Sequence, residues 1–298
     1  MSCTMAKNSN GMPESLVINL VSESTIPFQY LRGHQLYRLF LAIISAVELE
    51  NGQALRTSRR QSFALNPLQI VSQSQTTSAH NLKFLPLHHQ RETIPIRYAH
   101  SSIPGGTHCW WRIALLDDGL FAQVSPRLEQ VATRKPWFLG PARLHITNLL
   151  PTNVSEWTSC QSYQAIYKQA SNNNRYLTFQ LMTPAVFYQD GEETALPTRD
   201  AVFHSLRKRW NRYSGLVFAP NTITLITAKS FNLHTVKLSV GNNETIVGCL
   251  GKLTFQISDT ADPLIIKRIN ALADFSRYCG IGYKTFLGLG MVSVTATE

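Results

Sequence analysis

Three polar residues near the start of the chain, His34, Tyr37 and Arg38, carry side chains that could do chemistry together. They occupy positions i, i+3 and i+4, so on a helix their side chains meet on one face. The opposite arc of this helix is apolar and should face the core: Leu36, Leu39, Phe40, Ile43 and Val47. Histidine can move a proton near neutral pH, and arginine is a fixed cation that can stabilise negative charge in a transition state. We therefore expect a candidate catalytic patch of imidazole, phenol and guanidinium. A solvated helix face without a catalytic part is the other interpretation.

A glycine-rich stretch near the end of the chain could bind a phosphate. Residues 280–290 read GIGYKTFLGLG, with glycines at Gly280, Gly282, Gly288 and Gly290. Glycine lets backbone amides approach a ligand closely, and Lys284 would add positive charge. The stretch follows an expected helix and precedes a strand, the reverse of a dinucleotide fingerprint, and it has no GK[ST] at a helix start. A phosphate-binding loop and a structural turn both remain open.

Positive charge is concentrated on a third segment. Arg207, Lys208, Arg209 and Arg212 supply four cations within six positions of an expected helix. The whole chain has 28 Lys and Arg against 18 Asp and Glu, a formal net charge of +10 and a pI near 9.5. This balance favours a polyanionic partner such as nucleic acid, because binding to phosphates releases counterions. For each single residue, a solvated helix face is the alternative.

Several other functions find no support in the sequence. The five cysteines lie far apart without a CxxC pair, and the nine histidines form no metal-ligand pattern, so we expect neither a disulfide framework nor a metal site. No cofactor motif is present, and we expect no cofactor. The polar first fifteen residues lack the apolar core of a signal peptide, and no apolar run has the length of a membrane span. We expect a cytoplasmic protein that does not contact a membrane.

The candidate residues belong to a repeated order of predicted elements. Periodicity predicts strand, helix, two strands, helix and strand in each half, the βαββαβ pattern of an α+β ferredoxin-like domain. The elements of the first half cover 15–21, 30–50, 63–71, 110–116, 120–133 and 142–150. Those of the second half cover 175–181, 198–213, 222–238, 245–258, 262–278 and 291–295. We therefore expect two tandem ferredoxin-like domains, at 12–150 and 151–298, each with a sheet face on which RNA could bind.

Motifs of the second half resemble those of a known family. The first motif consists of TPAVF at 183–187, LP at 196–197 and VFHSLRKRWN at 202–211. The second is VGCLGKLTF at 247–255, and the third is FSRYCG at 275–280, followed by the glycine-rich stretch. In this order they resemble the CRISPR-associated repeat-RNA endoribonucleases, the Cas6 family of the RAMP superfamily. The first half matches weakly, at 33–41 and 63–68. The resemblance implies two ferredoxin-like domains and metal-independent cleavage of CRISPR repeat RNA that forms a stem-loop.

Such cleavage needs no metal when the RNA 2′-hydroxyl attacks the adjacent phosphate in line and leaves a 2′,3′-cyclic phosphate. A proton must leave the 2′-hydroxyl, another must reach the 5′-oxygen, and the phosphoryl oxygens gain charge. Many relatives have a catalytic histidine where this chain has Arg56, which stays protonated and is a poor base. Arg56 would instead stabilise the phosphorane. Either His34 transfers the proton, or cleavage depends on positioning the 2′-hydroxyl.

The predicted partners are CRISPR repeat RNA and mature crRNA, whose 3′ handle the protein would keep bound, and other subunits of a CRISPR effector complex. The predicted RNA-binding residues are Arg59, Arg60, Arg207, Lys208, Arg209, Arg212, Arg277, Gly280, Gly282, Lys284, Gly288 and Gly290. A non-catalytic RNA-binding subunit of a CRISPR ribonucleoprotein is the second functional hypothesis. The arginine at position 56 favours it slightly.

Overall fold

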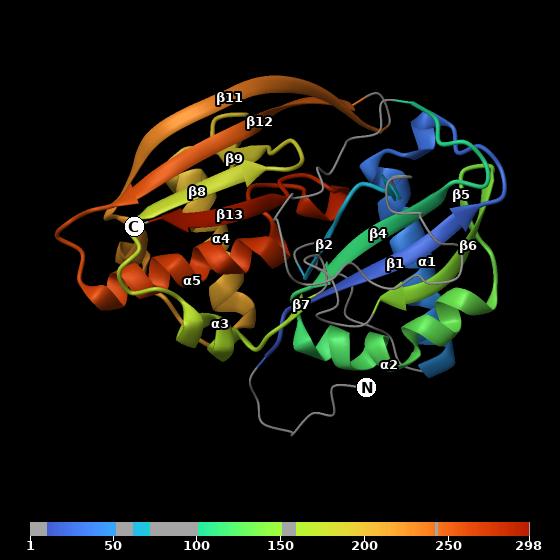
Figure 1. Ribbon diagram of the computed structural model, residues 1–298, viewed down its shortest axis with the longest axis horizontal. Coiled ribbons are helices and arrows are strands. Elements are labelled where there is room, and N and C mark those ends of the chain that lie inside the picture. The colour runs from blue at the N-terminus through green and yellow to red at the C-terminus, as the bar shows by residue number, and fades with distance from the viewer. Residues whose placement is uncertain (1–10, 52–61, 72–100, 151–158, 242–243, 298) are drawn as a thin grey trace.

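The computed structural model contains two large antiparallel sheets, each covered by helices (Figure 1), and a separate two-stranded sheet formed by β9 and β10. It describes residues 11–51, 62–71, 101–150, 159–241 and 244–297. The first half contains β1 (Glu14–Ser22), α1 (Gly33–Asn51), β2 (Phe63–Leu65), β3 (Gln69–Ile70), β4 (His108–Leu115), α2 (Asp118–Arg134), β5 (Trp137–Leu139) and β6 (Ala142–Leu150). The second half contains β7 (Ser159–Cys160), α3 (Tyr163–Gln169), β8 (Tyr176–Leu181), β9 (Phe187–Gln189), β10 (Glu192–Thr194), α4 (Arg199–Tyr213), β11 (Ile226–Gly241), β12 (Glu244–Ile257), α5 (Pro263–Cys279) and β13 (Val292–Thr297).

The first sheet has the strand order β2-β4-β1-β6-β5, with β3 paired to β4 and β7 paired to β1. The chain order β1-α1-β2-β4-α2-β6 with β1 between β4 and β6 is that of a ferredoxin-like fold. Along β1 the side chains of Leu16, Ile18 and Leu20 are buried in the core that α1 and α2 cover. Alternation of side chains between the two faces of a strand explains this spacing.

Helix α1 has one apolar stripe, which the sequence predicted. Its buried side chains recur at helical spacing and join the first core: Leu36, Leu39, Phe40, Ile43 and Val47. The helix begins at Gly33 rather than at residue 30, because residues 28–30 form a short 3-10 turn after Pro27. The start of α1 is therefore separated from the preceding strand by a tight turn.

The second sheet has the order β11-β12-β8-β13, again the ferredoxin-like arrangement. Helices α3, α4 and α5 contribute to its core, in which Phe179, Phe203 and Phe255 make edge-on ring contacts. Helix α5 begins at Pro263, and the Asp262 side chain accepts hydrogen bonds from the amides of Leu264 and Ile265. Two ferredoxin-like domains are thereby confirmed.

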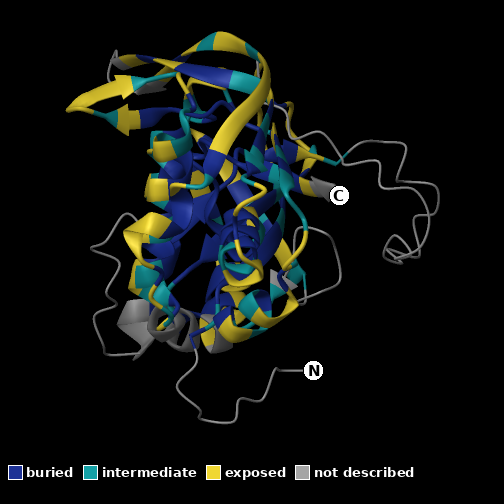
Figure 2. Cartoon of the chain, turned by 90° about the vertical axis from the view of Figure 1, so that its left-hand side faces the viewer, coloured by how far each residue is buried: buried dark blue, intermediate teal, exposed yellow. Residues whose placement is uncertain are grey.

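The hairpin β11–β12 joins the two halves. It arches from the second sheet toward the first (Figure 1), and its side chains Leu238 and Ile246 are buried in the first core. Figure 2 shows exposed residues along much of this hairpin, while the interior between sheets and helices is buried. Buried apolar contacts of this kind stabilise the relative placement of two domains.

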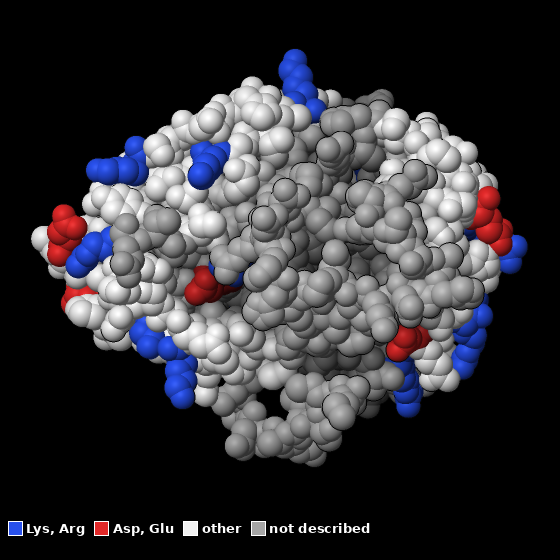
Figure 3. All heavy atoms as spheres, in the orientation of Figure 1, with Lys and Arg blue, Asp and Glu red and all other residues white. Residues whose placement is uncertain are grey.

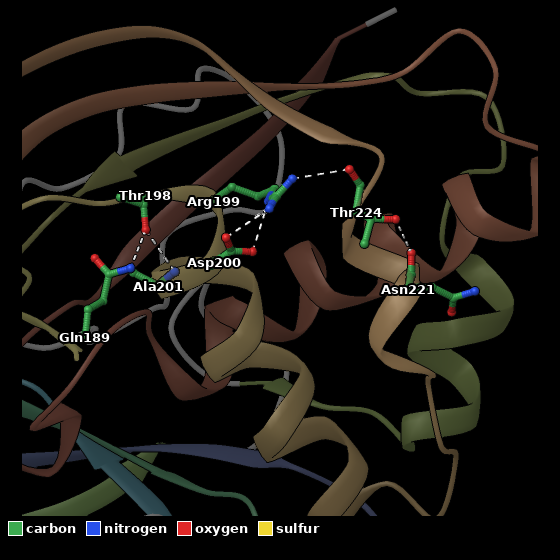
Figure 4. A network of polar contacts seen from close by, with 7 residues as sticks. All are labelled: Gln189, Thr198, Arg199, Asp200, Ala201, Asn221 and Thr224. Carbon is green, nitrogen blue, oxygen red and sulfur yellow. Dashed lines mark hydrogen bonds and ion pairs between the residues drawn. The ribbon is translucent and has the colours of Figure 1, made fainter. Parts of the chain in front are cut away.

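Polar contacts fix the start of α4 (Figure 4). The Thr198 hydroxyl accepts a hydrogen bond from the Ala201 amide and another from the Gln189 side chain of β9. Arg199 binds both carboxylate oxygens of Asp200 and donates to the Thr224 carbonyl oxygen. The β9–β10 hairpin and the segment before β11 are thus tied to the first turn of α4.

Some details differ from the prediction. Strand β5 and the β9–β10 hairpin were not predicted, and the stretch 63–71 divides into β2 and β3. The predicted boundary at 150/151 borders residues 151–158, which lie outside the described part of the chain, so it stays a prediction. None of the helices in the described residues has the length and hydropathy that a membrane crossing requires.

Candidate functional site

The first turn of α1 lies against the glycine-rich stretch at the other end of the chain. Within that stretch, Thr285–Leu287 forms the 3-10 helix η4, which contacts both α1 and β2. A β-carbon at Gly33 would lie 2.2 Å from the Leu287 carbonyl oxygen, so only glycine permits this approach. The two segments that carry the candidate chemistry, nearly the full chain apart in sequence, therefore meet at one place.

His34, Tyr37 and Arg38 all lie on α1, but they differ in exposure. Arg38 is exposed, whereas His34 and Tyr37 are half-buried. The Tyr37 ring stacks near Phe63 of β2, at 6.0 Å between centroids, and meets Phe286 of η4 edge-on at 5.4 Å. Tyr37 is thus packed between two elements rather than presented on an open patch, and its ring helps to fix η4 beside α1.

The glycines of 280–290 are used by the protein's own backbone. Gly280, Gly282 and Gly290 have φ values of 66°, 81° and 67°, in the left-handed region. A β-carbon would lie 1.9 Å from the Ile281 carbonyl oxygen at Gly290, 2.3 Å from that of Val186 at Gly282, and 2.7 Å from that of Gly290 at Gly280. These three glycines therefore have a packing role within the protein, and their predicted contact with a phosphate stays a prediction. Gly288, with φ 83°, has only the milder contact of 3.3 Å with Pro67.

Backbone hydrogen bonds hold the same loop in place. The Ile281 amide donates to the Gly290 carbonyl oxygen at 2.7 Å, and the Tyr283 amide donates to that of Val186 at 2.6 Å. The Gly290 amide donates to the Pro184 carbonyl oxygen at 2.9 Å. These amides are consequently occupied, and the loop is a rigid part of the fold.

Lys284, which the sequence predicted to add positive charge for a phosphate, is paired with an acidic side chain of the protein. Its side chain is only 13% exposed, and its ammonium lies 2.6 Å from a carboxylate oxygen of Glu193 in β10. The residue has φ 57°, which places it in the left-handed region. The ion pair fastens the glycine-rich loop to the β9–β10 hairpin and neutralises the charge predicted for phosphate.

The four cations of α4 divide into two kinds. Arg209 is buried, and its guanidinium donates to the carbonyl oxygens of Cys279 at 2.6 Å and Gly280 at 3.0 Å. Arg207 is half-buried and donates to the Phe218 carbonyl oxygen at 3.1 Å. Lys208 and Arg212 are exposed and lie one turn apart. Arg209 is thus a correction to the predicted RNA contacts, because a buried guanidinium bound to the protein cannot reach a ligand at the surface.

Arg277 lies on the exposed side of the last turn of α5. It donates to the Val294 carbonyl oxygen at 3.0 Å and lies 3.7 Å from a carboxylate oxygen of Asp274. Arg56, Arg59 and Arg60 lie outside the described residues. Figure 3 shows the described Lys and Arg side chains spread around the rim of one face rather than gathered in one block.

Arg112 is a functional-site neighbour that the sequence reasoning missed. It lies on β4, is buried, and donates to the Arg277 carbonyl oxygen at 2.7 Å. Burial lowers the pKa of its guanidinium to about 10, because desolvation disfavours the charged form. Arg112 and Arg209 therefore both satisfy backbone carbonyls at the end of α5, where the glycine-rich loop begins. An arginine inside the apolar strand HCWWRIAL was the available signal.

Among the described residues, no group of three or more His, Cys, Asp or Glu side chains is placed to hold a metal ion. The cysteines at 109, 160, 249 and 279 form no disulfide. Burial raises the pKa of the Cys109 thiol to about 12 and those of Cys249 and Cys279 to about 11. These three thiols are therefore poor nucleophiles at neutral pH.

Two family models match the chain. The CRISPR Cas6 N-terminal domain matches residues 12–168, and CRISPR-associated endoribonuclease Cas6 matches residues 179–292. The CRISPR-associated endoribonuclease Cas6 of Streptococcus thermophilus is 25% identical over an alignment of 217 residues, with 69% of this chain and 82% of that relative covered.

Solved structures share the fold. A Cas6 product complex superposes with a TM-score of 0.71 at 22% identity, covering 95% of this chain and 100% of that one. Thermus thermophilus Cas6 gives a TM-score of 0.64 at 18% identity, covering 97% and 100%. The matched models extend over the whole glycine-rich loop and over both sheets apart from the start of β8 and most of β13, and they confirm the resemblance seen in the sequence. The chain therefore belongs to the Cas6 family of CRISPR-associated endoribonucleases, which process CRISPR repeat RNA.

Proposed function

We propose that this Cas6 protein cuts CRISPR repeat stem-loop RNA without a metal ion, by attack of the RNA's own 2′-hydroxyl. The attack forms a bond between O2′ and phosphorus and breaks the bond between phosphorus and O5′. The products are a 2′,3′-cyclic phosphate on the upstream fragment and a 5′-hydroxyl on the downstream fragment. The proton of the 2′-hydroxyl leaves with a base, and O5′ receives a proton, so the reaction consumes no cofactor.

The contact between the first turn of α1 and the glycine-rich loop carries this proposal. It brings His34 of the first domain beside the loop whose sequence is the strongest family motif of the second. His34 is half-buried, which restricts the ring while leaving part of it accessible. Imidazole can take or give a proton near neutral pH, so His34 is the proposed proton carrier.

The cations have separate proposed parts. Arg38, exposed one turn after His34, and Arg56 are the proposed stabilisers of the negative charge that develops on the phosphoryl oxygens. Lys208 and Arg212, exposed on one side of α4, are the proposed contacts to phosphates of the RNA stem. Arg59, Arg60 and Arg277 are proposed to contact RNA as well. After cleavage the protein stays bound to the 3′ handle of the crRNA through these contacts, where it could join other effector subunits.

Single-turnover cleavage of a repeat RNA by His34→Ala tests the proposal. The rate should fall roughly 10²–10⁴-fold, the usual worth of general acid–base catalysis, with RNA affinity nearly unchanged. His204→Ala, an exposed histidine on α4, is the control and should cut at the wild-type rate. A His34→Ala protein that cuts within a few-fold of wild type would remove His34 from the mechanism. Tight binding without cleavage by the wild type would favour the non-catalytic subunit instead.

A further inference from the structure

Two tyrosines lie exposed beside the glycine-rich loop. Tyr188 of β9 is 56% exposed and Tyr283 of the loop is 39% exposed. Their ring centroids are 5.4 Å apart, with an angle of 42° between the ring planes. Large aromatic side chains are usually buried when they serve only the core. An exposed pair at this position is available to a flat ligand.

The backbone around the two rings is firmly held. Tyr283 pairs with Val186 just before β9, through its amide and the Val186 carbonyl oxygen, at 2.6 Å. On the hairpin, Tyr188 is directly opposite Glu193, whose carboxylate binds the ammonium of Lys284. Ala185 in turn exchanges two backbone hydrogen bonds with Cys249 of β12, at 2.8 and 2.9 Å. The backbone that carries both rings is therefore fixed, and the two rings also contact each other, which reduces the entropy lost when a ligand binds.

Stacking, rather than charge, is what this surface offers. The ammonium of Lys284 lies 5.6 Å from the Tyr283 ring centroid, but its charge is paired with that of Glu193. A ligand on the rings would thus gain mainly dispersion and π contact. Aromatic side chains bind unpaired bases in this way whatever the sequence, because every base has a π face.

We propose that Tyr188 and Tyr283 form a stacking platform for an unpaired base of the bound RNA. The proposal rests on the RNA-binding function proposed above, and it assigns to that function a contact with single-stranded nucleotides beside the stem. Tyr283 belongs to the same loop as Phe286, which touches Tyr37 of α1. An RNA strand reaching His34 along this loop would pass the tyrosines, so nucleotides flanking the cut are the expected occupants.

Fluorescence anisotropy of the full-length protein with a repeat RNA, 2′-O-methylated throughout to prevent cleavage, tests the platform. Tyr188→Leu and Tyr283→Leu should each weaken binding roughly 5- to 100-fold, the range for loss of one stacked base. Tyr188→Phe and Tyr283→Phe should stay within about twofold, because phenylalanine keeps the π face. The slope of log K against log salt should not change, since no phosphate contact is removed. Phe138 of β5 is also aromatic and is 63% exposed. The Phe138→Leu variant is therefore the control and should bind RNA as the wild type does.

A second measurement begins with the wild-type protein alone, so its first result does not depend on how a variant folds. Single abasic positions placed along the unpaired part of the RNA should weaken wild-type binding at one or two sites. The same abasic RNAs should lose no further affinity with Tyr188→Leu. Wild-type affinity of both leucine variants, or abasic losses that persist in Tyr188→Leu, would overturn the platform. Both readouts report binding, so failure of the cleavage mechanism leaves them unaffected and is detected separately.

Discussion

The guanidinium of Arg209 donates a hydrogen bond of 2.6 Å to the backbone carbonyl oxygen of Cys279, the last residue of α5. A second bond, to Gly280, makes this side chain a link between α4 and the start of the glycine-rich loop. The last carbonyls of a helix have no partner within the helix, so a buried α5 end needs such donors. Arg209 is therefore expected to act on stability.

Arg209→Ala should lower the free energy of unfolding by about 3 kcal/mol, because hydrogen bonds to a charged group contribute about 1.5–3 kcal/mol each. Urea denaturation measures the change. Its neighbour Lys208, which is exposed, is the matched control. Lys208→Ala should alter stability by less than about 0.5 kcal/mol while weakening RNA binding. If Arg209→Ala were as stable as wild type and merely bound RNA less well, the packing role assigned to Arg209 would be wrong.

Gly290→Ala should destabilise the protein by more than about 3 kcal/mol, since its β-carbon would lie 1.9 Å from a backbone oxygen. Gly215 is a matched control with φ 70° and no atom within 4 Å of a β-carbon. Gly215→Ala should cost only about 1 kcal/mol, the strain of a left-handed alanine. Thermal and urea unfolding of the two variants give the comparison. Equal losses would mean that the close approach at Gly290 is not a constraint on the fold.

Glu193→Gln should tighten RNA binding and steepen the salt dependence by about one ion, because it releases Lys284 from its ion pair. Binding titrations at several salt concentrations measure both effects. Glu192→Gln changes the same charge on the adjacent, exposed residue and controls for long-range electrostatics. If Glu192→Gln steepened the salt dependence of RNA binding equally, the ion pair between Glu193 and Lys284 would have no specific effect on binding.

Because burial raises the pKa of the cysteine thiols, we expect the protein to lose stability at alkaline pH. Burial raises the pKa of Cys279 to about 11, above its ordinary value of 9.0. The stability that the neutral thiol contributes is fully present below about pH 9 and is lost as the pH rises through 11. The free energy of unfolding should therefore decline more steeply from pH 8 to 10.5 in wild type than in Cys279→Ala. Parallel slopes for the two proteins would contradict the raised pKa.

The sequence predicted the order of the elements because each long strand and helix has its own apolar period. Helix α1 shows this most clearly, and its buried residues are the ones expected. The three-residue strands β5, β9 and β10 are too short to show a period, and their pairing depends on the neighbouring strands. The architecture of two ferredoxin-like sheets could therefore be predicted from the sequence, but these three short strands could not.

The candidate site was predicted less completely, because it depends on contacts between residues that are far apart in the sequence. The glycine pattern shows that residues 280–290 need unusual backbone angles, but not whether a ligand or the protein makes the close approach. The helical pattern placed Arg209 beside Trp210, but its partners Cys279 and Gly280 lie seventy residues away in the chain. The ion pair of Lys284 likewise depends on a hairpin that no local pattern predicted. The contact between α1 and the glycine-rich loop also joins residues that are distant in the sequence, so no local pattern predicts it.

The central claim is cleavage by the RNA's own 2′-hydroxyl, and the most direct measurement is cleavage of a repeat RNA in excess EDTA with both product ends mapped. The account predicts the same single-turnover rate with EDTA as with magnesium. It also predicts a 2′,3′-cyclic phosphate on the upstream product and a 5′-hydroxyl on the downstream one. Loss of cleavage in EDTA that magnesium restores, with a 3′-hydroxyl and a 5′-phosphate at the cut, would contradict it.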